Sequence, residues 1–179
     1  MIILVEGKEK SGKSRVAEGI FRAFKDEGYY IATMIPYGDY GEEIIRRHRK
    51  LRDDLSLVTV ESPYLDDVSM IPKGSRVILE DISNLVANHF FNRKEKISEY
   101  LHCLDDLISR CSELIIVGMR DISDDTGASY DDETQRYIHE IDSFMDYLET
   151  ISDIVIYLEN GIIKYKKGSE LRIKRKDEK

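Results

Sequence analysis

The sequence predicts an α/β domain in which a mainly parallel β-sheet is covered by helices on both faces and carries an antiparallel strand at one edge. Two observations predict the parallel sheet: short apolar runs recur along the chain, and helical patterns separate most of them. A third predicts the edge, because Asn160-Gly161, a dipeptide typical of two-residue hairpin turns, stands between the last two runs. The runs occupy residues 2–5, 29–35, 57–60, 77–79, 114–117, 154–158 and 162–165.

The composition is typical of one soluble domain that needs neither disulfides nor a structural metal. The chain has 179 residues, and its two cysteines, Cys103 and Cys111, match no zinc-binding spacing. The net charge of −8 disfavours nucleic acid as a partner. Neither a signal peptide nor a membrane-spanning run is found, so we expect a cytoplasmic protein. Charged residues dominate from Lys166 onward; we assign residues 1–167 to a single nucleotide-binding domain and 168–179 to a solvated, frayed tail.

The first apolar run leads directly into a phosphate-loop motif, G-x-x-x-x-G-K-S. A helical pattern follows over residues 16–24, so strand, loop and helix stand in the order that turns backbone N–H groups toward a triphosphate. In this motif Lys13 reaches the β and γ oxygens and the Ser14 hydroxyl binds Mg²⁺. The alternative is a strand-to-helix turn that binds nothing, but every fixed position of the motif is present. The loop consists of Gly7, Lys8, Glu9, Lys10, Ser11, Gly12, Lys13 and Ser14.

Two acids, Glu80 and Asp81, follow the apolar run 77–79. Ligands of open α/β sheets bind at the carboxyl ends of the strands, so we expect Glu80 to share the Mg²⁺ ion with Ser14. The alternative is that both acids begin the next helix, where they suit the positive end of its dipole. For Asp81 the two interpretations are equally favoured.

The basic segment 42–52 contains a histidine, His48, that a helical wheel places on the apolar side, between Ile44, Ile45 and Leu51. A lone histidine on an apolar face is usually a core residue. The neighbouring arginines disfavour its imidazolium form, however, and so keep a ring nitrogen neutral near neutral pH. The same arginines could neutralise a triphosphate while that nitrogen attacks phosphorus.

Five motifs stand in a fixed order in the first half of the chain. They are the phosphate loop, Tyr30-Ile31-Ala32-Thr33, His48-Arg49-x-x-Arg52, Thr59-Val60-Glu61 with Pro63, and Glu80 with Ser83 and Asn88. In order and spacing they resemble the bifunctional adenosylcobinamide kinase/adenosylcobinamide-phosphate guanylyltransferase family of cobalamin biosynthesis. The resemblance implies a RecA-like P-loop NTPase fold and assembly as a homotrimer.

The resemblance also implies a chemistry. In that family a histidine takes GMP from GTP as a covalent phosphoramidate and passes it to adenosylcobinamide phosphate, and this role falls here on His48. The implied substrates are GTP or ATP, with Mg²⁺, and a corrinoid acceptor, adenosylcobinamide. The implied nucleotide site comprises the phosphate loop with Thr33, Arg49, Arg52, Glu61 and Glu80.

The second half of the chain departs from the family pattern. Where the family shows Asn-Glu-Val-Gly after the fifth strand, a proline and then Arg-Phe-Arg-Asp, this chain has Gly118-Met119-Arg120-Asp121 and an acidic loop over residues 121–133. That loop either binds Mg²⁺ or is a solvated turn whose last acids begin a helix near Glu133. The departures are compatible with loss of one of the two activities. They leave two alternatives: a diverged P-loop kinase with another small-molecule acceptor, and a non-catalytic nucleotide-binding protein.

Overall fold

The computed structural model describes residues 1–23, 27–35, 46, 55–122 and 130–173. Within these ranges one seven-stranded sheet runs in the order β3-β2-β4-β5-β1-β6-β7. All neighbouring strands are parallel except β6 and β7, which form the antiparallel edge. The strands are β1 (Ile2–Gly7), β2 (Gly28–Ala32), β3 (Leu57–Glu61), β4 (Ser75–Glu80), β5 (Cys111–Met119), β6 (Ile154–Glu159) and β7 (Ile162–Lys167).

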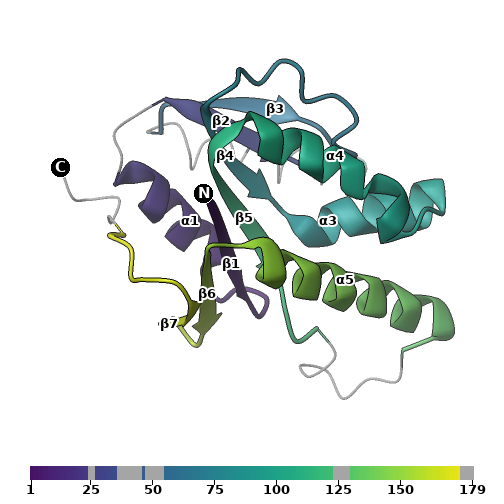
Figure 1. The fold of residues 1–179 in the computed structure, drawn as a ribbon. Helices are drawn as coiled ribbons and strands as arrows, with labels where there is room; N and C mark the ends of the chain where they lie inside the picture. The colour runs from purple at the N-terminus through teal and green to yellow at the C-terminus, as the bar shows by residue number, and fades with distance from the viewer. Residues whose placement is uncertain (24–26, 36–45, 47–54, 123–129, 174–179) are drawn as a thin grey trace.

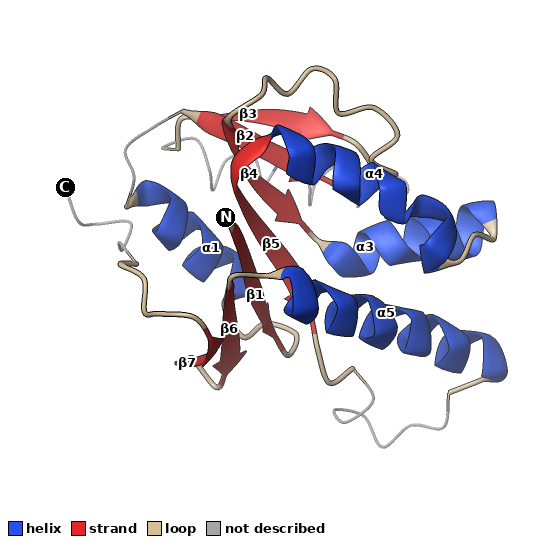
Figure 2. Cartoon of the chain, in the orientation of Figure 1, coloured by secondary structure: helices blue, strands red, loops and turns tan. Residues whose placement is uncertain are grey.

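Helices cover both faces of this sheet (Figures 1 and 2). One face packs against α1 (Lys13–Arg22), and the other carries α3 (Ile82–Ala87), α4 (Ile97–Arg110) and α5 (Asp132–Ile151). A short π-helix, η1 (Asn88–Arg93), continues α3. The predicted fold class, a mainly parallel sheet between two helical layers with one antiparallel edge strand, is therefore confirmed.

The central strand β1 shows why its sequence is apolar throughout. Ile3 and Val5 belong to the core on the α1 side, and Leu4 belongs to the core on the opposite side. All three are completely buried. A parallel strand that is covered on both faces needs apolar residues at every position rather than an alternating pattern. Glu6 breaks this pattern at the end of the strand, directly before the phosphate loop.

The antiparallel edge is formed by the predicted two-residue turn. Asn160 and Gly161 both have positive φ, 50° and 77°, as a tight hairpin of this kind requires. Further along, Ile156 faces Tyr165 and Val155 faces Lys167, so that Lys166 is the extra residue of a β-bulge.

The segment after β7 differs in part from the frayed tail that the composition predicts. Leu171 and Ile173 pack against the apolar core on the α1 side. In addition, the Leu171 backbone N–H donates to the Tyr165 hydroxyl at 3.0 Å. The core therefore contacts two residues of this charged segment, Leu171 and Ile173.

Candidate nucleotide-binding site

The phosphate loop follows β1 at the carboxyl edge of the sheet and leads into α1. Gly7 has φ of 151°, and a Cβ atom there would lie 2.3 Å from the Leu158 carbonyl oxygen. Gly12 is the N-cap of α1 with φ of 96°. Both positions therefore require glycine. The first turn of α1 carries no acidic side chain, so its N-terminus is electrostatically suited to an anion.

Ser14 and Glu80, the two residues predicted to bind one Mg²⁺ ion, lie side by side. The Ser14 hydroxyl donates to Oε1 of Glu80 at 2.5 Å, and the Tyr30 hydroxyl donates to Oε2 at 2.5 Å. A hydroxyl and a carboxylate are the hard oxygen ligands that Mg²⁺ prefers. These two side chains therefore fit the ion, and the structure places them at the entrance to α1.

The Lys13 ammonium lies within the phosphate loop, where Nζ donates to the Lys8 carbonyl oxygen at 2.6 Å. Burial lowers the pKa of Lys13, and the negative charges of Asp81, Glu80 and Glu9 oppose that shift only in part. The Lys13 ammonium is poorly solvated, so a bound phosphate would stabilise its positive charge.

Asp81 begins α3, as one of the two interpretations of this residue predicts. Its Oδ1 accepts the backbone N–H of Asn84 at 3.0 Å, the usual N-cap geometry. Burial raises the pKa of the Asp81 carboxyl. Thr33, the residue directly after β2, bonds to the Asp81 backbone: its hydroxyl donates to the Asp81 carbonyl oxygen at 2.8 Å and accepts the Asp81 N–H at 2.9 Å.

Other residues of the predicted nucleotide site are spread along the same edge of the sheet. Glu61 ends β3, opposite Ala32 in the register that also sets Ala32 opposite Glu80. Glu61 is exposed, whereas Thr33 is buried. Within the phosphate loop, Lys10 pairs with Glu9 at 3.2 Å. The predicted nucleophile His48, with Arg49 and Arg52, lies outside the described residues.

The acidic loop lies in part outside the described residues, over 123–129. At its end Asp131 caps α5, because the Thr134 N–H donates to Oδ1 of Asp131 at 2.7 Å. The last acids of this loop therefore begin a helix, as one of the two interpretations predicts. Across the described part of the chain, no group of three or more His, Cys, Asp or Glu side chains could hold a metal ion.

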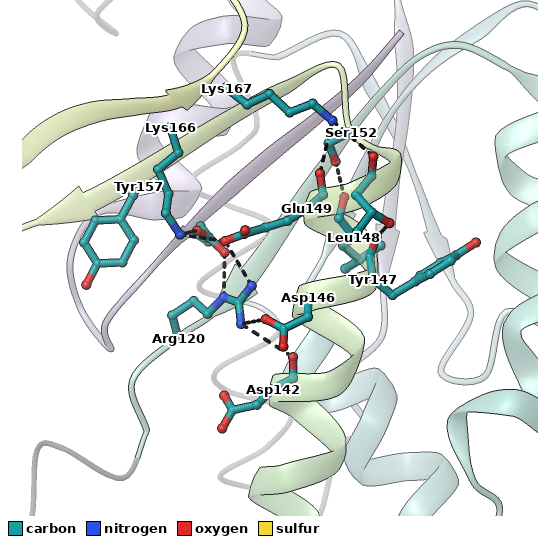
Figure 3. Close-up of polar contacts among 12 residues, drawn as sticks. Arg120, Asp142, Asp146, Tyr147, Leu148, Glu149, Ser152, Tyr157, Lys166 and Lys167 are labelled. Carbon is teal, nitrogen blue, oxygen red and sulfur yellow. Dashed lines mark hydrogen bonds and ion pairs between the residues drawn. The ribbon is translucent and has the colours of Figure 1, made fainter.

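A set of charged residues next to the phosphate loop received no role from the sequence (Figure 3). Glu6 is completely buried, and its carboxylate accepts from Arg120 and from Lys166, at 2.8 Å each. Lys166, where the stretch predicted to be solvated begins, is exposed, but the bulge in β7 also brings its ammonium to this buried partner. One signal was present in the sequence: a carboxylate inside an apolar strand needs a cation.

None of the helices that the structure describes has the length and apolar character that crossing a membrane requires.

Comparisons with known proteins agree with this architecture. A KaiC-like protein from the hyperthermophilic archaeon Pyrococcus horikoshii has a similar fold, with a TM-score of 0.50 and 18% sequence identity over 98% of this chain and 82% of that chain. This likeness supports the RecA-like fold that was expected.

A search of curated proteins gives no match. The sequence profile of one family, described as cobinamide kinase / cobinamide phosphate guanyltransferase, matches residues 3–164, nearly the whole chain. The match extends through the second half, where the sequence departs from the expected pattern, as well as through the phosphate loop. The chain therefore belongs to the cobinamide kinase / cobinamide phosphate guanyltransferase family.

Proposed function

We propose that this protein phosphorylates a corrinoid alcohol, adenosylcobinamide, and transfers GMP from GTP to the resulting phosphate, with His48 as the covalent carrier. The observation that supports this proposal most directly is the Ser14–Glu80 pair at the mouth of a complete phosphate loop, in a chain of this family. We further propose that the protein works in the cytoplasm as a homotrimer.

In the guanylyl step, a neutral ring nitrogen of His48 attacks the α-phosphorus of GTP. The new P–N bond forms as the bond to the pyrophosphate oxygen breaks, and pyrophosphate leaves. An oxygen of the corrinoid phosphate then attacks the same phosphorus and the P–N bond breaks, which returns the free histidine. Each half-step exchanges one bond to phosphorus for another.

The remaining residues bind and neutralise the polyphosphate. The loop amides and Lys13 contact the phosphates, while Arg49 and Arg52 offset the charge that develops during attack. Ser14 and Glu80 would hold Mg²⁺, which supplies charge neutralisation when bound. Thr33 and Glu61 complete the nucleotide site. In the kinase step, the acceptor hydroxyl attacks the γ-phosphorus of GTP or ATP at the same site. The bond from the γ-phosphorus to the bridging oxygen breaks, GDP or ADP leaves, and the hydroxyl proton is released to solvent.

Incubation with α-labelled GTP and Mg²⁺ tests the carrier role of His48. The wild-type protein should gain the mass of GMP, and the adduct should hydrolyse in acid and map to His48. The His48→Ala variant should bind Mg·GTP and gain no label. His139→Ala, which removes an exposed histidine of α5, is the matched control and should label normally. Label that survives in His48→Ala, or maps elsewhere, would contradict the proposal.

A second candidate function is a P-loop kinase with a different acceptor. The segment that departs from the family pattern favours this second function. It contains Arg120, whose bonds to Glu6 and Asp146 place the altered segment beside the phosphate loop. In this case corrinoids would fail to stimulate nucleotide turnover, whereas another hydroxylated metabolite would succeed. Tight nucleotide binding without turnover or adduct, across a range of acceptors, would instead favour a non-catalytic binding protein.

A further inference from the structure

A buried carboxylate directly precedes the phosphate loop. Glu6 lies in β1, between β5 and β6, and is followed by Gly7, the first residue of the loop. Its two oxygens have different cationic partners: Oε2 accepts from Nε of Arg120 and Oε1 accepts from Nζ of Lys166, both at 2.8 Å. A negative charge in this position would repel a polyphosphate unless the cations offset it.

Arg120 connects the Glu6 carboxylate to α5, and Figure 3 shows its contacts with α5. Its Nη1 donates to Oδ1 of Asp146 at 2.7 Å, and its Nη2 lies 3.0 Å from Oε1 of Glu149. One guanidinium therefore contacts three carboxylates, with the side chain only 12% exposed. A lysine ammonium could not reach three partners in this planar arrangement.

The backbone of Arg120 holds the loop as well. Its N–H donates to the Gly7 carbonyl oxygen at 3.0 Å, which extends the pairing of β5 with β1 to the first residue of the loop. The main chain and the side chain of one residue thus fix Gly7 and Glu6 together.

The surroundings of Glu6 set its charge balance. Arg120 follows β5, Asp146 and Glu149 belong to α5, Tyr157 to β6 and Lys166 to β7. Burial raises the pKa of Glu6, and the hydrogen bonds from Lys166 and Arg120 act in the opposite direction. Removal of either cation therefore leaves a carboxylate that is costly to keep ionised.

We infer that Arg120 is a positioning residue for nucleotide binding: it fixes the start of the phosphate loop against α5 and offsets the buried charge of Glu6 that a triphosphate would otherwise meet. This inference rests on the proposed nucleotide site. It assigns a role to a residue in the segment where the chain departs from the family pattern.

Direct measurement of the dissociation constant for GTP tests the inference. Arg120→Gln should weaken GTP binding about tenfold, since one opposing charge is lost beside the loop. The double variant with Glu6→Gln should recover most of this loss, because it also removes the carboxylate. Arg136→Gln, the same substitution at an exposed arginine of α5, should bind as the wild type does.

The pH dependence separates positioning from general loss of structure. Without Arg120 the Glu6 carboxylate takes up a proton more readily, so the deficit of Arg120→Gln relative to wild type should become smaller as the pH is lowered. The double variant should show no such change. A folded Arg120→Gln protein that binds GTP like the wild type, or a deficit that persists in the double variant, would overturn the inference.

Two further outcomes remain decisive. If Arg120→Gln does not fold, Lys166→Gln removes the other, partly exposed cation and should weaken GTP binding in the same direction; unchanged affinity would overturn the inference. If the wild-type protein itself binds no nucleotide, the proposed function fails along with this inference. A wild-type protein that binds GTP normally, with variants that do not differ from it, would remove the inference alone.

Discussion

The hydroxyl of Ser14 donates a hydrogen bond to the carboxylate of Glu80 across 66 residues of sequence, with the two oxygens 2.5 Å apart. Ser14 lies in the first turn of α1, and Glu80 ends β4, two strands away from β1 in the sheet. The carboxyl ends of parallel strands meet at one edge, and this brings the pair together. The same two oxygens are the ones that we propose for Mg²⁺.

Glu80→Gln should lower Mg²⁺-dependent transfer about a hundredfold, because a neutral amide replaces an anionic oxygen at the ion. The measurement is the transfer rate over a series of Mg²⁺ concentrations. Glu159→Gln, which changes a surface carboxylate that pairs with Lys164, serves as control and should leave the curve in place. An unchanged Mg²⁺ dependence in Glu80→Gln would exclude Glu80 as a ligand.

Nucleotide binding should take up protons at alkaline pH. Burial lowers the pKa of Lys13, so its charged fraction falls as pH rises toward that lowered value, and affinity should fall with it. A bound phosphate raises the pKa again, which draws in a proton. Calorimetry in two buffers with different ionisation enthalpies measures the uptake. Lys13→Arg keeps its charge throughout and should lose this part of the pH dependence; equal uptake in both proteins would contradict the assignment.

Asp81→Ala should lower the free energy of unfolding by about 1 kcal/mol through loss of the α3 N-cap, whereas Asp81→Asn should keep the cap. The carboxyl has a raised folded-state pKa, so its contribution is fully present below the unfolded value of 3.8 and is lost as pH rises through the folded value. Asp81→Asn should therefore gain stability relative to wild type as pH rises above 3.8. Urea unfolding at several pH values checks both effects, and a relative gain toward acid pH would contradict the sign.

Asn88→Asp should destabilise the protein by about 2 kcal/mol or more, although the two side chains have the same shape. The buried Asn88 amide donates to the carbonyl oxygens of Thr33 at 2.7 Å and Pro63 at 2.9 Å, and a carboxylate would face both acceptors. Urea unfolding gives the difference. Asn160→Asp is the control, since Asp-Gly forms the same turn and should cost little; equal effects of the two substitutions would show that the Asn88 bonds contribute nothing.

Local patterns predicted the parts of the fold that depend on neighbouring residues. The apolar run at Ile2–Val5, the glycine loop and the Asn160-Gly161 turn each depend on residues only a few positions apart, and the structure contains all three. The placement of Glu80 beside Ser14 was also predicted. Ligands of open α/β sheets bind at the carboxyl ends of the strands, and this rule applies whatever the order of the strands in the sheet.

Contacts that depend on strand order could not be predicted. Arg120 contacts Glu6 across 114 residues because β5 lies beside β1 in the sheet. The apolar pattern of the sequence does not show which strands are neighbours. The hydroxyl of Tyr30 reaches Glu80 for the same reason, since β2 pairs with β4. The bond from Lys166 to Glu6 was not predicted, because composition alone describes a charged stretch and carries no information on a bulge.

The bulge in β7 gives two consecutive lysines the same orientation. Side chains normally alternate along a strand, yet Lys166 bonds to Glu6 and Glu149, while Lys167 donates to the last carbonyl oxygens of α5 at Glu149 and Thr150. A deletion of one residue here would restore alternation and send one of the two ammonium groups to the opposite side of the sheet. The length of this edge strand, counted in single residues, thus sets whether one or two lysine ammonium groups contact α5.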